Sequence, residues 1–122
     1  MKTENILQVK TYAFAIRIVK ATQYLTIEKK EYVLSKQLLR SGTSIGANTE
    51  EAIGGQSDKD FYAKLNIVYK EARETFYWIK LLRDTCYFEE THAFSLLKDC
   101  EEILKIVGSI IKTMKIKLKI NF

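Results

Sequence analysis

The sequence has few of the residues that end helices and form tight turns. Its 122 residues include no proline and only five glycines. A sandwich or barrel made of many short strands needs many tight turns, and glycine and proline are the residues that favour them. Their scarcity argues against such a fold and favours a few long helices.

Residues that carry out chemistry are scarce as well. The chain has one histidine, His92, and two cysteines, Cys86 and Cys100. Both cysteines fall on predicted apolar helix faces, where we expect protonated, unreactive thiols, and a single disulfide between them is the alternative. A di-iron site in a helix bundle needs two Glu-x-x-His steps, and the step from Glu89 to His92 is only one. Because the glycine-rich phosphate-binding motifs are also missing, we predict a protein that is not an enzyme and has no metal or cofactor.

Long hydrophobic runs and export signals are missing too. No apolar stretch approaches the ~20 residues of a membrane-spanning helix, and the first residues do not resemble a signal peptide. With 47% hydrophobic and 29% charged residues, the composition is that of a folded domain. We therefore expect one cytoplasmic domain over residues 1–122, with no membrane partner.

What the sequence does contain is helical periodicity. Apolar residues recur every three or four positions in four segments. This spacing predicts helices at about 4–24, 27–53, 58–86 and 89–116. Helices of this length with short joints pack beside one another, so we predict an all-α, antiparallel up-down-up-down four-helix bundle.

The joints and one apolar face can be assigned more closely. We expect Thr26 to cap the second helix and Gly54 to follow its end. The segment from Ser57 to Asp60 resembles a capping box and predicts the start of the third helix. The first helix has a wide apolar stripe formed by Ile6, Val9, Ala13 and Ile16, with Leu7, Phe14 and Ile18 beside it.

The second predicted helix carries a continuous polar stripe beside its apolar face. The members of this polar stripe share one side of the helix: Gln37, Arg40, Ser44, Asn48 and Glu51. Three interpretations are open, namely a solvated flank, a ligand site, and a hydrogen-bonded network or subunit interface. The residue types favour the network or interface, in which we expect Arg40, Asn48 and Glu51 to bond to one another. The small residues from Ser41 to Ser44 also predict that another helix or chain approaches closely there.

The same stretch resembles a known family. Between positions 37 and 61 it matches the pattern of the 23S rRNA-intervening-sequence proteins, the small bacterial "four helix bundle proteins". The matching residues are Gln37, Leu38, Arg40, Ser44, Ile45, Asn48, Glu51, Gly54, Ser57 and Phe61. Glu74 falls where the family has a glutamate in its third helix. Thr49, Glu50 and Ala52 depart from the pattern without affecting the predicted fold.

The resemblance implies assembly as well as a fold. Members of this family form four-helix bundles that assemble into homo-oligomeric rings, often pentamers. A similar bundle serves as an accessory protein of diversity-generating retroelements, where a basic ring is thought to contact nucleic acid and a reverse transcriptase. By this analogy we expect a homo-oligomer, with a pentamer as the family precedent. The polar stripe, together with Glu74, is expected to hold the bundle or the ring together.

The distribution of charge supports a polyanionic partner. The net charge is +5, and no acidic residue follows Glu102. The basic residues of this last part are Lys105, Lys112, Lys115, Lys117 and Lys119. A ring would multiply their charge, so we predict RNA or DNA binding, or scaffolding, through them, with a solvated helix end as the alternative. A competing hypothesis is a protein–protein adaptor that docks a nucleic-acid enzyme such as a reverse transcriptase.

Aromatic residues gather on the third predicted helix. They are Tyr62, Tyr69, Phe76, Tyr77 and Trp78. Aromatic rings can stack on bases, but they also dominate cores and interfaces. We therefore expect them in the bundle core or at a subunit interface.

Overall fold

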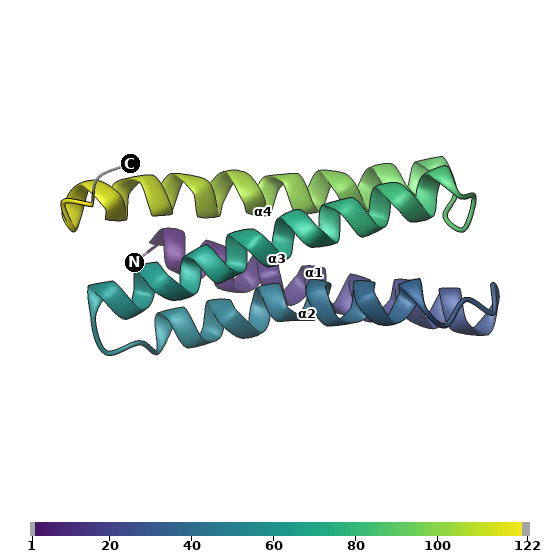
Figure 1. The fold of residues 1–122 in the computed structure, drawn as a ribbon, viewed down its shortest axis with the longest axis horizontal. Coiled ribbons are helices and arrows are strands. Elements are labelled where there is room, and N and C mark those ends of the chain that lie inside the picture. Colours follow the sequence, from purple (N-terminus) through teal and green to yellow (C-terminus); the bar gives the residue numbers. More distant parts are fainter. Residues whose placement is uncertain (1, 121–122) are drawn as a thin grey trace.

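The protein folds into four helices. The computed structural model describes the backbone of residues 2–120 and the side chains of residues 6–120. The helices are α1 (Lys2–Ile27), α2 (Leu34–Ile53), α3 (Asp58–Asp84) and α4 (Glu90–Lys117), and the described residues contain no strand. Figure 1 shows that the helices run alternately up and down, with both chain ends at one end of the bundle. The predicted all-α four-helix bundle is confirmed.

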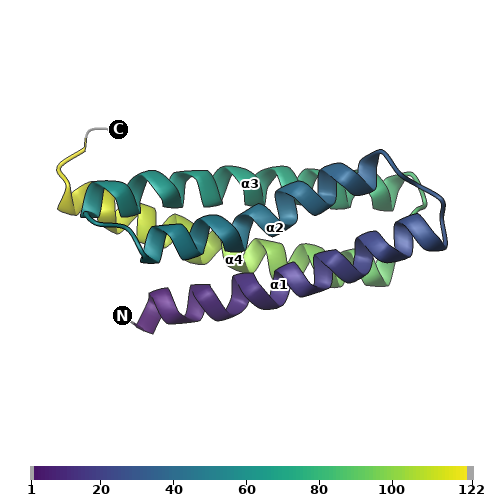
Figure 2. The ribbon, with the colours of Figure 1, turned by 90° about the horizontal axis from the view of Figure 1, so that it is seen from below.

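Each helix packs against two neighbours. The packed pairs are α1–α2, α2–α3, α3–α4 and α4–α1. Figure 2 shows α2 between α1 and α3. The contact between α2 and α3 is the most extensive and that between α1 and α4 the least. Helix α1 is therefore attached to the bundle mainly through α2.

The core between the helices is almost wholly apolar. Each helix turns a side chain inward every three or four residues. The large, fully buried side chains come from all four helices: Leu7, Phe14, Ile18, Leu25, Leu38, Ile45, Leu65, Val68, Ile79, Leu82, Leu96 and Ile103. Burying a side chain of this kind contributes roughly 1.5–3 kcal/mol, so this pattern fixes which side of each helix faces inward.

The inward face of α1 is not the stripe that the periodicity favoured. Leu7, Phe14 and Ile18, which the sequence placed beside that stripe, are buried in the core. Val9 and Ile16, which belong to the predicted stripe, are 68% and 42% exposed. The wide stripe did not show which of its residues face the core, because α1 has apolar residues on two sides and spacing alone cannot tell which side meets the neighbouring helices.

The joint between α1 and α2 also differs from the prediction. Thr26 lies inside α1 rather than capping α2, and α2 begins only at Leu34. The Ser35 amide donates to the Glu31 carboxylate at 2.7 Å, and the Ser35 hydroxyl donates to the Glu31 carbonyl at 2.8 Å. This reciprocal pair satisfies backbone groups that the first turn of a helix leaves unpaired. Glu31, four residues before Ser35, thus caps the first turn of α2, the role that was expected of Thr26.

The turns at the two ends of α3 gave one correct and one wrong prediction. Ser57 accepts a hydrogen bond from the Asp60 amide at 3.1 Å, which confirms it as the N-cap of α3. Cys86 was expected on an apolar face, but it is exposed in the turn between α3 and α4 with a backbone φ of 67°. Helix α3 ends at Asp84, two residues before Cys86, so Cys86 lies outside the apolar periodicity of the helix.

The small residues of α2 allow α1 to approach closely. A Cβ atom at Gly42 would lie 2.7 Å from Ile18 Cγ2, and one at Gly46 would lie 3.3 Å from the Thr11 carbonyl oxygen. At 2.7 Å, Ile18 or the whole of α1 would have to shift, so the observed position of α1 depends on the glycine at position 42. The close approach predicted for this stretch is confirmed, and the approaching element is α1.

Candidate functional site

The polar stripe of α2 lies along the junction with α3. Arg40 Nη1 lies 3.3 Å from Glu71 Oε1, and Arg40 Nη2 pairs with Glu74. Trp78 Nε1 donates to the same Glu74 carboxylate at 3.0 Å. Arg40 thus bridges two carboxylates on successive turns of α3, and Glu74 is held from two sides.

These contacts keep both partners charged. The hydrogen bond from Trp78, followed by the one from Arg40, lowers the pKa of Glu74 below its usual range. The hydrogen bond with Glu74 raises the pKa of Arg40. The Glu74 contribution to stability is therefore present above the ordinary pKa of a glutamate and is lost as the pH falls through its lowered value. At neutral pH the group is a fixed ion pair rather than a proton donor or acceptor.

The other members of the polar stripe bond elsewhere. The Ser44 hydroxyl donates to the Arg40 carbonyl at 2.6 Å, and the Asn48 amide donates to the Ser44 carbonyl at 2.9 Å. Glu51 accepts from Lys64 of α3 at 2.7 Å, and Gln37 is exposed. The mutual bonding expected of Arg40, Asn48 and Glu51 is therefore not found. Asn48 follows Arg40 by eight residues, about 12 Å along the helix, which is too far for these two side chains to meet. Asn48 and Glu51 are only three residues apart, but each bonds to another partner.

A buried polar contact behind Arg40 was missed by sequence reasoning. Thr75 of α3 donates to the Ser41 hydroxyl of α2 at 2.9 Å. Both side chains are fully buried. Threonine and serine within apolar helix faces gave the only signal, and it did not say which residues would meet. The α2–α3 junction thus has one buried polar pair in addition to the ion pairs at its surface.

The basic residues at the end of the chain differ in their ion pairs and in their exposure. Lys105 and Lys117 are in exposed ion pairs, with Glu101 at 3.5 Å and with Asp58 at 3.1 Å. Lys112 and Lys119 are exposed, and Lys115 is half-buried. The alternating segment at the end proves helical as far as Lys117, where α4 ends.

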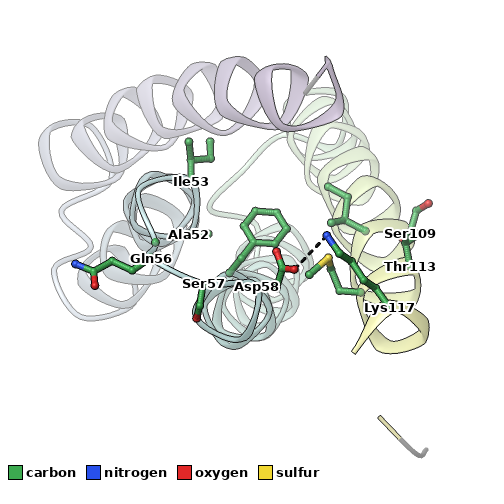
Figure 3. Close-up of a pocket in the computed structure, with 12 residues that line it drawn as sticks. Ala52, Ile53, Gln56, Ser57, Asp58, Ser109, Thr113 and Lys117 are labelled. Atoms are coloured by element: carbon green, nitrogen blue, oxygen red, sulfur yellow. Dashed lines mark hydrogen bonds and ion pairs between the residues drawn. The ribbon is translucent and has the colours of Figure 1, made fainter. Parts of the chain in front are cut away.

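Two cavities lie beside these lysines. One, of about 440 Å³, is an open hollow bordered by the end of α2, the start of α3 and the last turns of α4, and the Asp58–Lys117 pair lies across it (Figure 3). The other, of about 350 Å³, lies between α3 and α4. Its lining residues are Asn66, Tyr69, Gly108, Ile111, Lys112 and Lys115. Lys112, Lys115 and Lys117 therefore border concave surface, whereas Lys105 and Lys119 line neither cavity.

The third-helix aromatics are mostly structural. Tyr62, Tyr69, Phe76 and Trp78 are partly buried and pack against the core, as expected. Tyr77 is the exception, because it is 57% exposed and meets Trp78 edge to face, with ring centroids 5.1 Å apart.

The two thiols and the histidine have different surroundings, because Cys86 is exposed and Cys100 is buried. Burial raises the pKa of the Cys100 thiol to about 12, and its Sγ lies 3.2 Å from the Ala72 carbonyl oxygen. His92 lies in the first turn of α4 against the Phe88 ring. Within residues 6–120, no three histidine, cysteine, aspartate or glutamate side chains are grouped to hold a metal ion. None of the described helices is long and apolar enough to span a membrane.

Comparison with known proteins decides the family. Residues 3–109 match the model of the family described as 23S rRNA-intervening sequence protein. The chain belongs to this family. The resemblance seen in the motif of α2 is thereby confirmed.

A solved relative agrees with this assignment. A crystallised protein of unknown function from the S23 ribosomal protein family of Bacteroides thetaiotaomicron VPI-5482 is 50% identical in sequence. The match covers 90% of this chain and 98% of that one, with a TM-score of 0.89. A comparison with curated proteins gave no match. In this 23S rRNA-intervening sequence protein, two motif residues far apart in sequence, Arg40 and Glu74, meet across the α2–α3 junction.

Proposed function

We propose that this protein is a non-catalytic, cytoplasmic, ring-forming homo-oligomer that binds RNA or DNA through the basic end of α4. The observation that carries the proposal is the run of five lysines from Lys105 to Lys119, which no acidic residue interrupts. Each lysine can replace a counterion on one phosphate, and the copies in a ring add their contributions.

The surroundings of these lysines favour a phosphate partner. The ion pairs of Lys105 and Lys117 are exposed, so they are worth little and exchange readily for phosphate contacts. Lys112 and Lys115 border the 350 Å³ cavity, where Tyr69 and Asn66 supply a ring and an amide within reach of a nucleotide. These features support backbone contacts without base-specific recognition.

The test is the salt dependence of binding. A labelled single-stranded RNA and a DNA duplex would be titrated with the native chain between 50 and 200 mM salt, the range over which affinity falls roughly 10³–10⁵-fold for a protein that binds 6–10 phosphates. Lys112→Gln and Lys119→Gln should weaken binding to both. Replacing one lysine that contacts a phosphate should reduce the slope of log K against log salt by roughly 1.

Lys98→Gln is the matched control. Lys98 is exposed on α4 and points to nearly the same side as Lys112, but it lies 14 residues earlier, about 21 Å along the helix. Lys98→Gln removes the same charge as the other two substitutions and should leave the slope of log K against log salt unchanged. No binding at 50 mM salt, or an equal weakening by Lys98→Gln, would contradict the proposal. Salt-insensitive capture of a protein partner would favour the adaptor function instead.

A further inference from the structure

The side of α1 that faces away from the bundle is almost free of charge. The exposed residues between positions 6 and 27 all fall within one arc of the helix, which we call the outer face of α1. They are Ile6, Val9, Tyr12, Ala13, Ile16, Val19, Lys20, Gln23 and Ile27. Lys20 is the only charged member, and from Ile6 to Val19 the face has no polar residue except the Tyr12 hydroxyl.

The other helices do not share this property. The exposed positions of α4 include Lys98, Glu101, Glu102 and Lys105, and charged residues recur in the same way along α2 and α3. Isolated exposed apolar residues are normal in proteins, but a continuous row of them over several turns indicates a contact surface. The outer face of α1 is therefore an exception within the bundle and needs an occupant.

The described chain does not supply that occupant. Helix α1 packs only against α2 and α4, on other sides of the helix. Only three residues of the 122 lie outside the described backbone. They are residue 1 and residues 121–122, so the longer piece spans roughly 7 Å at most, whereas the outer face from Ile6 to Ile27 is about 32 Å long. The cover therefore comes from outside these residues.

We propose that the outer face of α1 binds a second copy of this chain. The proposal rests on the self-assembly included in the proposed function and assigns that assembly to a surface. Because the centre of the face is uncharged, two copies with a net charge of +5 can meet there without opposing like charges.

The rims of the outer face fit the same occupant. On the α4 side, the ion pairs Lys10–Glu102 and Arg17–Asp99 balance positive with negative charge. On the α2 side, the Gln8 amide donates to Glu50 at 3.0 Å. An apolar centre with a polar, charge-balanced rim is the usual anatomy of a protein interface.

The size of the outer face is sufficient for a specific contact. Val9, Tyr12 and Ile27 are each more than 60% exposed, and Ile6, Ile16 and Val19 are 38–48% exposed. Together these side chains offer roughly 500 Å², so an interface with a second copy buries on the order of 1,000 Å² in total, the lower limit for a specific interface.

The experiment compares two matched substitutions. Tyr12 on the outer face of α1 is 69% exposed, and Phe94 on α4 is 68% exposed. The mass of the native chain and of Tyr12→Glu and Phe94→Glu would be measured by sedimentation equilibrium, with helicity checked by circular dichroism. We expect a native mass that is a multiple of 14.2 kDa. Tyr12→Glu should raise the dissociation constant by roughly 100-fold or more, and Phe94→Glu should leave it unchanged.

Three results would overturn the assignment. They are a native chain that stays at 14.2 kDa, a helical Tyr12→Glu protein that remains assembled, and equal dissociation by Phe94→Glu. Should Tyr12→Glu lose its helicity, Val9→Lys provides the same test at a second position. RNA titration of the same samples separates the two proposals. An assembled Tyr12→Glu protein that binds RNA contradicts only this interface, and a Tyr12-dependent assembly that binds no RNA contradicts only the nucleic-acid function.

Discussion

Helix α1 is joined to the bundle in two different ways. Along α2 the contact is steric, because the Ile18 side chain occupies the space where Gly42 would carry a side chain. Along α4 it is electrostatic, through the partly exposed ion pairs Lys10–Glu102 and Arg17–Asp99. The contact with α2 leaves no room for a side chain at position 42. The ion pairs with α4 are made by long side chains that can adjust.

This difference indicates where the position of α1 is decided. Close packing has little tolerance for a single added or removed methyl group. Exposed ion pairs usually contribute no more than about 1 kcal/mol and weaken with salt. We therefore expect α1 to be held by the α2 side and only aligned by the α4 side.

The largest effect should come from emptying the steric contact. Ile18→Ala removes a fully buried side chain and should lower the free energy of unfolding by about 2–5 kcal/mol. Urea denaturation would measure this change. Ile116→Ala is the control, because that residue is 71% exposed and its truncation should cost less than about 1 kcal/mol. Similar destabilisation by the two variants would contradict the assigned core.

An intermediate effect should come from overfilling the same contact. Gly42→Ala places a methyl group against Ile18 and should cost about 1–3 kcal/mol in urea denaturation, despite the better helix propensity of alanine.

The cause of that destabilisation can be isolated. In the Ile18→Ala background, Gly42→Ala should cost less, with a coupling energy of about 0.5–3 kcal/mol, because the clashing Cγ atoms are gone. Gly54→Ala should be nearly neutral, since its methyl group would lie at the ordinary distance of 3.5 Å from the Glu50 carbonyl oxygen. Additive effects of the two substitutions would show that steric contact does not hold α1.

The smallest effect should come from the α4 side. Arg17→Met and Asp99→Asn each remove one partner of a partly exposed ion pair, in which Arg17 Nη1 lies 2.6 Å from Asp99 Oδ2. A double-mutant cycle should give a coupling below about 1 kcal/mol that shrinks further in 0.5 M salt. A coupling energy larger than the destabilisation by Gly42→Ala would show that α1 is held more by α4 than by α2.

Periodicity predicted the number and type of helices because each has an inward apolar face. It left the inward face of α1 open, because Val9 and Ile16 are as apolar as the buried Phe14 and only the neighbouring helices decide between the faces. It also failed at Thr26, because a good capping residue does not end a helix that can continue. Cys86 was assigned to a face although it lies beyond the end of the helix.

The polar stripe was easier to find than to explain. Offsets along one helix placed its members on one side, but partners on another helix depend on the packing of α2 against α3. Hence Glu71, which completes the Arg40 cluster, and the buried pair of Ser41 and Thr75 gave no usable signal in the sequence. The lysines of α4 were visible as a charge run, whereas the cavities beside them appear only once the helices are brought together.

The position of Cys86 makes the orientation of neighbouring copies measurable. Its thiol is exposed in the turn between α3 and α4. This turn lies at the end of the bundle opposite to both chain ends (Figure 1). Cys100 is buried with a pKa of about 12, so a maleimide dye at neutral pH reacts at one site. Copies that meet antiparallel carry their dyes at opposite ends, about 40 Å apart by helix length, and copies that meet parallel bring them much closer. Energy transfer between donor- and acceptor-labelled copies therefore distinguishes an alternating assembly from one in which all bundles point the same way.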